Sequence, residues 1–123
     1  MGANIKRSYL YNTDPRISNA IEFINAHMGT KITLMRISKI MCLSYGYSSV
    51  LFKREIGCCL CNYLKKLRIR KARNLLNNAS IQIKDVAYSV GYRDAANFSH
   101  DFKRIAGLSP VSYRKKLYTS RAK

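Results

Sequence analysis

The side chains of this sequence that are best suited to recognise another molecule fall into two short segments with matching spacing. In the second segment, Asn97 can form two hydrogen bonds with an adenine edge, and His100 can donate to guanine acceptors. In the first segment, Val50 offers only an apolar surface, which suits a thymine methyl group. Helical spacing predicts an outward face in the first segment that comprises Gly46, Ser49, Val50 and Lys53. In the second segment, the residues predicted to point outward or lie on the flank are Ala96, Asn97, Ser99, His100 and Lys103.

The two segments belong to an internal repeat. Phe52-Lys53-Arg54-x-x-Gly57 returns as Phe102-Lys103-Arg104-x-x-Gly107, and Tyr63 returns as Tyr113. Upstream of these motifs the copies align at an offset of 49 residues instead of 50. The additional residue falls between two predicted helices, where a turn tolerates an insertion. A module repeated on one chain indicates two similar contacts with one long, repetitive partner.

The charge of the sequence favours a negatively charged partner. Lys and Arg number 23 against 6 acidic residues, which gives a net charge of +17. Residues 1–57 contribute +5 (8 basic, 3 acidic), residues 58–78 contribute +6 (6 basic, none acidic) and residues 79–123 contribute +6 (9 basic, 3 acidic). The predicted helices themselves are therefore basic. Nucleic acid, and double-stranded DNA in particular, is the first candidate, and an anionic membrane surface is the second.

The same composition argues against catalysis and against a bound metal or cofactor. The 6 acidic and 2 His residues form no recognisable base–nucleophile pair or metal cluster. Cys58, Cys59 and Cys61 have C-C-x-C spacing without a nearby His, which matches no common zinc pattern. No apolar run approaches the roughly 20 residues that span a bilayer, and residues 1–10 lack the apolar core of a signal peptide. We therefore expect a cytoplasmic, nucleoid-associated protein that is not an enzyme, needs no cofactor and keeps its thiols reduced.

The elements that must position the outward side chains are almost all helical. Asp14, Thr33 and Ser44 are typical helix N-caps, and Gly57 and Gly107 are predicted to end the helices that carry the outward faces. The sequence predicts an all-α protein of about seven helices. Its expected parts are an N-terminal arm (1–13), a first helix-turn-helix subdomain (14–59), a linker helix (60–77), a second helix-turn-helix subdomain (78–117) and a basic tail (118–123).

The predicted linker helix has two apolar stripes with different directions. The early stripe comprises Leu60, Tyr63, Leu64 and Leu67, and the later one comprises Ile69, Ala72 and Leu76. A helix with two differently directed stripes packs against two bodies, so we expect the linker to contribute to both cores. The last helix is expected to be short, from Pro110 through Tyr113.

A pair of helices with a tight turn and a polar outer face is typical of a helix-turn-helix. The major groove of B-DNA is about 12 Å wide and admits one helix. The first helix of such a pair braces the second against the DNA backbone. Each half of the sequence therefore predicts one helix that enters a major groove.

On these residues the chain resembles the DNA-binding domain of the AraC/XylS family of bacterial transcription regulators, from about Asp14 to Leu117. The resemblance implies two helix-turn-helix units joined by a long helix, with sequence-specific binding to promoter DNA, most often for activation. It implies base contacts by Gly46, Ser49 and Val50 in the first unit and by Ala95, Ala96, Asn97 and His100 in the second. The motifs that carry it are Leu51-Phe52-Lys53-Arg54-Glu55-x-Gly57, Ile83-x-Asp85-Val86-Ala87-x-x-Val90-Gly91-Tyr92 and Asn97-Phe98-Ser99-x-x-Phe102-Lys103-x-x-x-Gly107-x-Ser109-Pro110.

Contacts with the DNA backbone are expected next to these positions, because Lys and Arg neutralise phosphates and hydroxyl groups donate to them. The candidates are Ser44, Tyr45, Lys53 and Arg54 in the first unit and Arg93, Ser99, Lys103 and Arg104 in the second.

The first half departs from the family pattern at four positions. Ser48 stands where a core aromatic is usual, Val50 where Arg is frequent and Cys59 where a capping Ser is usual. Cys42 stands where a turn glycine is usual, and a residue other than glycine is disfavoured in a left-handed backbone. These departures concern packing and DNA reading in the first unit and leave the predicted fold unchanged.

Alternative interpretations stay open at this level. The chain is either a short regulator that acts alone or the DNA-binding fragment of a larger, effector-sensing regulator. A non-specific nucleic-acid-binding protein has the same charge, although the aromatic and glycine signals of common RNA modules are missing. Because the modules are tandem copies, we expect a monomer on an asymmetric DNA site. RNA polymerase is a candidate second partner.

Overall fold

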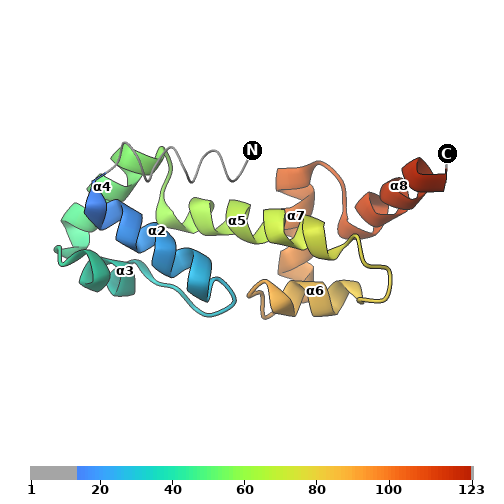
Figure 1. The fold of residues 1–123 in the computed structure, drawn as a ribbon, viewed down its shortest axis with the longest axis horizontal. Coiled ribbons are helices and arrows are strands. Elements are labelled where there is room, and N and C mark those ends of the chain that lie inside the picture. Colours follow the sequence, from blue (N-terminus) through green and yellow to red (C-terminus); the bar gives the residue numbers. More distant parts are fainter. Residues whose placement is uncertain (1–13, 123) are drawn as a thin grey trace. The chain divides into compact units, whose positions relative to one another are not determined.

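Seven α-helices make up the part of the chain that the computed structural model describes, residues 14–122 (Figure 1). No strand occurs within these residues, so the prediction of an all-α fold is confirmed. The expected N-terminal arm, residues 1–13, lies outside the described residues. The helices are α2 (Pro15–His27), α3 (Leu34–Met41), α4 (Tyr45–Ile56), α5 (Leu60–Leu75), α6 (Ile83–Ser89), α7 (Ala95–Ala106) and α8 (Pro110–Ala122).

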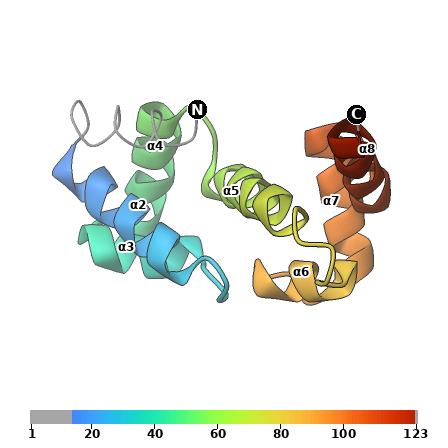
Figure 2. The same ribbon diagram turned by 45° about the vertical axis from the view of Figure 1, so that its right-hand side comes forward.

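The helices belong to two compact units, residues 1–64 and residues 65–123. In the first unit α2 packs on α3 and α3 on α4, and in the second unit α6 packs on α7 and α7 on α8. The division falls within α5, so this one helix contributes its first turn to the first unit and its later turns to the second. In each unit a short helix crosses the longer helix that follows it, α3 with α4 and α6 with α7 (Figure 2). Each unit therefore contains the predicted helix-turn-helix pair.

Side-chain caps begin the first three helices at the predicted residues. Asp14 accepts a hydrogen bond from the Arg16 amide at 2.9 Å, Thr33 accepts from the Arg36 amide at 3.2 Å, and Ser44 accepts from the Tyr47 amide at 3.2 Å. Each cap satisfies a helix N–H group that has no partner within the helix and contributes about 1 kcal/mol. The predicted starts of α2, α3 and α4 are confirmed.

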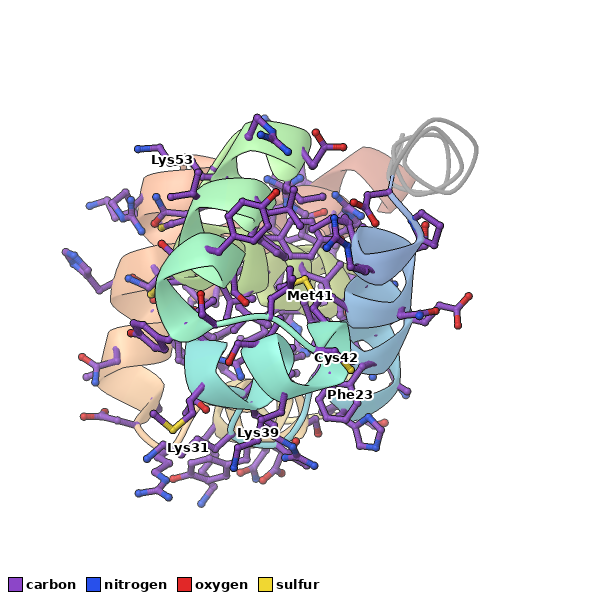
Figure 3. All side chains as sticks on the ribbon, turned by 90° about the vertical axis from the view of Figure 1, so that its left-hand side faces the viewer. Phe23, Lys31, Lys39, Met41, Cys42 and Lys53 are labelled. Atoms are coloured by element: carbon purple, nitrogen blue, oxygen red, sulfur yellow. The ribbon has the colours of Figure 1, made fainter. Side chains whose placement is uncertain are left out.

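The core of the first unit is built from one apolar face of each helix. All of its large side chains are aliphatic except Phe52, whose ring meets the Tyr63 ring edge-on at a centroid distance of 5.7 Å. Figure 3 shows Met41 inside this unit and Lys53 projecting away from it. The fully or almost fully buried residues are Ile17, Ala20, Ile21 and Ile24 of α2, Ile37 and Met41 of α3, and Leu51 and Phe52 of α4.

The second unit has a core of its own, to which the later apolar stripe of α5 contributes as predicted. Three residues of that stripe, Ile69, Ala72 and Leu76, are fully buried together with residues of α6 and α7. Around them stands a chain of aromatic contacts with centroid distances of 5.4 to 5.7 Å, from Tyr92 to Phe98, from Phe98 to Phe102 and from Phe102 to Tyr113. The other core members are Val86, Ala87, Val90, Phe98 and Phe102.

The turns of the two helix-turn-helix pairs show where the copies differ in length. Cys42 ends α3 with a left-handed backbone (φ 58°), and its counterpart 49 residues later is Gly91 (φ 103°). The next helices are capped by Ser44 and by Asp94, which are 50 residues apart. The additional residue of the second copy therefore lies in the turn, as predicted, and the alignment assigns it to Arg93.

Two boundaries differ from the sequence prediction. The linker helix ends at Leu75 and not at Asn77. The last helix runs from Pro110 to Ala122, where we predicted a short helix through Tyr113 and a basic tail over residues 118–123. Residues 118–122 continue the helix because no glycine or proline follows Pro110 to end it. At an offset of 50, α8 is the counterpart of α5, and the repeat extends beyond the residues that we assigned to it.

Candidate nucleic-acid interface

The outward face of α4 is formed by the residues that the sequence predicted. Gly46, Ser49, Val50 and Lys53 are all exposed, and Val50 retains 59% of its accessible surface. The opposite face, with Ser48, Leu51 and Phe52, is buried and holds the helix in place. Gly46 and Val50 follow one another along one line of this exposed face. The polar side chains of Ser49 and Lys53 lie beside that line.

The outward face of α7 presents a different set of groups at matching positions. Ala96, Asn97, His100 and Lys103 are exposed, whereas Ala95 and Ser99 are only partly exposed. Two hydrogen-bonding side chains, the Asn97 amide and the His100 imidazole, therefore lie on α7 where α4 carries Tyr47 and Val50. Phe98, Asp101 and Phe102 are buried on the opposite face and orient the helix.

The residues predicted to contact the DNA backbone surround both outward faces. Ser44 and Tyr45 are exposed at the start of α4, although the Ser44 hydroxyl also caps that helix. The guanidinium groups of Arg54 and Arg104 each lie near a carboxylate, at 3.6 Å from Glu55 and 3.8 Å from Asp101. Both contacts are long, and the two arginine side chains are more than half exposed, so the carboxylates bind the guanidinium groups weakly. Lys53, Arg93 and Lys103 are exposed and form no salt bridge within residues 14–122.

None of the outward positions of α4 and α7 is acidic, although the Asp94 carboxylate lies at the start of α7, where it accepts a hydrogen bond from the Ala96 amide at 2.7 Å. Asp14 and Asp94 cap helices, and Asp101 is buried. Helix α5 carries six basic residues and no acidic one. The two outward faces and the linker helix are therefore neutral or positive, which favours a polyanion over other partners.

A partly buried polar contact positions α7 and was not predicted from the sequence. The Tyr92 hydroxyl donates to Asp101 Oδ2 at 2.9 Å. Burial raises the pKa of the Tyr92 phenol, and the hydrogen bond to Asp101 raises it further, so the phenol stays protonated and acts as the donor. The Arg68 guanidinium of α5 lies 5.9 Å from the Tyr92 ring centroid. Asp101 at an inward position, three residues after Phe98, is the signal in the sequence that indicates such a contact.

A second contact missed from the sequence joins α8 to the end of α5. Arg114 donates from Nε to the Leu76 carbonyl at 3.3 Å and from Nη2 to the Asn78 carbonyl at 3.1 Å. Both carbonyls belong to the segment that directly follows α5, and Arg114 thus supplies hydrogen bonds to backbone groups outside any helix. This contact fixes the position of α8 within the second unit.

The described residues offer little to a metal ion. All four Cys side chains are free thiols, and three of them are exposed. Within residues 14–122 no group of three or more His, Cys, Asp or Glu side chains is placed to hold a metal. None of the helices described is long and apolar enough to span a membrane.

Comparisons with known proteins agree with this geometry. The helix-turn-helix domain family matches residues 37–116. The chain is 33% identical over 98 residues to the raffinose operon transcriptional regulatory protein RafR of Pediococcus pentosaceus, and equally to the lactose operon transcription activator of Staphylococcus xylosus. Each match covers 80% of this chain but 35% of the relative, so the chain spans about a third of the length of these relatives.

A solved structure extends the similarity to three dimensions. The C-terminal domain of AraT, a response regulator from Geobacillus stearothermophilus, superposes with a TM-score of 0.79 at 32% identity. The match covers 84% of this chain and 86% of that domain. The chain therefore belongs to the AraC-type helix-turn-helix family, whose members are DNA-binding domains of transcription regulators.

Proposed function

We propose that this chain binds one specific double-stranded DNA site by placing α4 and α7 in successive major grooves. The observation that carries the proposal is the pair of exposed, acid-free helix faces on two copies of one scaffold. Base reading is assigned to Gly46, Ser49 and Val50 on α4 and to Ala95, Ala96, Asn97 and His100 on α7. The difference between the two faces supports a site whose two halves have different sequences.

The tandem arrangement supports a single chain on an asymmetric site. A helix of 16 residues such as α5 is about 24 Å long at 1.5 Å per residue. Adjacent major grooves on one side of DNA repeat about every 34 Å, so a linker of this length is compatible with two successive grooves. A palindromic DNA site matches a protein dimer with two-fold symmetry. Two tandem copies along one chain lack that symmetry, so we expect a site that is not a palindrome.

Phosphate contacts are assigned to the basic residues that flank the outward faces. Lys53 and Arg54 follow the reading positions of α4, and Lys103 and Arg104 follow those of α7 at the same spacing. Exposed basic residues of α5 add to this set. Each phosphate that the protein neutralises releases counterions, so binding should weaken steeply as the salt concentration rises.

The transcriptional role proposed for the chain is activation, through a further contact with RNA polymerase. The lactose operon transcription activator of Staphylococcus xylosus, 33% identical over the shared residues, supports this direction. Transcription in vitro from a template that carries the selected site tests this role. An increase in transcript on addition of the protein supports activation, and a decrease contradicts it.

Selection from a random duplex library tests the DNA-binding proposal. Duplexes retained by the protein should converge on one asymmetric sequence of about two helical turns. Binding to that sequence and to a scrambled version at several salt concentrations then gives the ratio of specific to non-specific affinity, which is expected to be at least about 10³. A ratio near one would support a non-specific nucleic-acid-binding protein, and a palindrome bound by two chains would contradict the monomer.

A further inference from the structure

Gly46 occupies the middle of the outward face of α4, and nothing in the protein requires a glycine there. It lies in a regular helix and is not among the residues with a left-handed backbone. A Cβ atom built at Gly46 meets no other heavy atom within 4 Å. Among residues other than proline, glycine has the lowest helix propensity, so the fold itself favours alanine at this position. A glycine without an internal reason is typical of a close approach by another molecule.

The large side chains near Gly46 are mainly apolar. Val50 lies one turn further along the same line of α4 and is 59% exposed, and Tyr45 in the first turn is 57% exposed. Tyr47 on the flank is 43% exposed. Half of the six exposed large hydrophobic residues within the described part of the chain therefore lie on this one helix. An apolar surface of this kind on a DNA-facing helix needs an apolar partner.

The corresponding surface of α7 has the opposite character. At the offset of 50, Gly46 corresponds to Ala96, Tyr47 to Asn97 and Val50 to His100. At these positions α7 carries hydrogen-bonding side chains, Asn97 and His100, whereas Gly46 and Val50 offer none, and hydrogen bonding from the reading positions of α4 is left to the Ser49 hydroxyl. In the major groove, the apolar feature of a base edge is the C5 methyl group of thymine, and 5-methylcytosine presents the same group.

We propose that Gly46 and Val50 form a contact site for a pyrimidine 5-methyl group, so that the first unit reads DNA by methyl contact while the second reads it by hydrogen bonds. The missing Cβ of Gly46 leaves room for a methyl carbon to approach the backbone of α4 at van der Waals distance. The Val50 side chain covers the methyl group from the next turn. This inference rests on the proposed DNA-binding function and names the group that α4 recognises.

Deoxyuridine substitution tests the site because it removes only the methyl group. In the selected duplex, each thymine in the half read by α4 is replaced singly by deoxyuridine, and each thymine in the other half serves as the control. We expect about a fourfold loss of affinity for each contacted methyl group in the first half and less than twofold in the second. In the first half, a cytosine placed at the sensitive position should bind weakly and recover when it is 5-methylated.

Two variants separate the methyl contact from the stability of the fold. Gly46→Ala should melt at a temperature at least as high as the unchanged protein and yet bind the selected site at least tenfold more weakly. Val50→Thr keeps the shape of the side chain and should lower the ratio of affinities for thymine and deoxyuridine duplexes. Val111→Thr makes the same substitution at an exposed valine of α8, which has no assigned DNA contact, and should leave that ratio unchanged.

The outcomes distinguish this inference from the proposed function. If the protein does not prefer the selected duplex to a scrambled one, DNA reading itself is refuted. If it prefers the selected duplex but binds deoxyuridine duplexes and the Gly46→Ala variant normally, only the methyl site is refuted. Loss of discrimination in Val50→Thr together with the deoxyuridine effect supports the site.

Discussion

Ser48 and Phe98 occupy the same position in the two helix-turn-helix units, fifty residues apart, and both are fully buried. Phe98 packs against the rings of Tyr92 and Phe102, whereas the Ser48 hydroxyl is buried with no hydrogen-bond partner among the described residues. The second copy of the scaffold is thus held by a chain of four aromatic rings, whereas the first keeps the Phe52–Tyr63 pair among aliphatic side chains. The same backbone arrangement does not need the same core.

The contact between the turn and the second helix of each unit has also changed. Tyr92 and Asp101 form a partly buried hydrogen bond in the second unit. Their counterparts are Leu43, at the offset of 49, and Leu51, at the offset of 50, and Leu51 is fully buried. A directional polar contact in one unit is therefore replaced by an apolar pair in the other. The Tyr92–Asp101 hydrogen bond orients α7, and leucines at the corresponding positions of the first unit cannot form such a bond with α4. A directionally fixed helix suits the hydrogen-bonding role proposed for α7.

The largest expected effect concerns the aromatic core. Phe98→Ala should destabilise the second unit by about 3–5 kcal/mol, because it removes a fully buried ring from between two others. Urea denaturation followed by circular dichroism measures the loss. In the first unit the counterpart change, Ser48→Ala, should be neutral or stabilising by about 1 kcal/mol, since it removes a buried hydroxyl without a partner. Equal losses in the two variants would contradict the difference between the cores.

The partly buried hydrogen bond should have the next largest effect. Tyr92→Phe leaves the Asp101 carboxylate without its donor and should cost about 1–3 kcal/mol. The double variant Tyr92→Leu/Asp101→Leu reproduces the apolar pair of the first unit and should recover most of the loss, because replacing both partners leaves no unsatisfied group. A double-mutant cycle on thermal unfolding checks this, and a double variant weaker than Tyr92→Phe would show that the two units cannot exchange this contact.

The difference between the two reading faces predicts different losses of DNA discrimination. Asn97→Ala and His100→Ala should each reduce the preference for the selected site by about 1–3 kcal/mol per lost base contact. Lys103→Ala should instead weaken binding to specific and scrambled duplexes about equally and reduce the salt dependence. Fluorescence anisotropy on both duplexes separates the two classes. Equal losses on both duplexes for Asn97→Ala would remove that residue from base reading.

The two turns allow a smaller and symmetric test. Cys42→Gly should stabilise the first unit by about 0.5–1 kcal/mol, because glycine adopts the left-handed backbone found at Cys42 without steric cost. Gly91→Ala should destabilise the second unit by about 1–2 kcal/mol for the same reason. Thermal unfolding of both variants provides the measurement. A destabilised Cys42→Gly variant would mean that contacts of the Cys42 side chain stabilise the first unit by more than the left-handed backbone at Cys42 destabilises it.

The smallest effect is a pH dependence in the first unit. The hydrogen bonds from Arg16 lower the pKa of Asp14 from 3.8 to about 2. A carboxylate with a lowered pKa in the folded state stabilises the protein above its unfolded pKa, and this contribution is lost as the pH falls from about 4 to about 2. The melting temperatures of the unchanged protein and of Asp14→Asn should therefore converge over this range. A constant difference between them down to pH 2 would contradict the assignment.

Most of the fold was predictable because it depends on short-range patterns. The caps at Asp14, Thr33 and Ser44 and the left-handed glycines at Gly57 and Gly107 act on their own helix ends, so they can be recognised without tertiary information. The end of α8 was predicted wrongly because a basic, polar segment gives no signal that distinguishes a helical turn from a tail. The outward faces of α4 and α7 were predictable because helical periodicity separates them from the buried side chains.

The sequence by itself determined that this chain is all-α, duplicated and basic, and which residues lie on the two outward faces. Those properties follow from composition, periodicity and local caps. Only the tertiary structure decided that Tyr92 meets Asp101, that Arg114 donates to the backbone that follows α5, and that the missing Cβ of Gly46 faces open space. These contacts join residues of separate helices and turns, or depend on the space around one residue. Local sequence patterns do not predict such distances, because the packing of separate helices and turns against one another determines them.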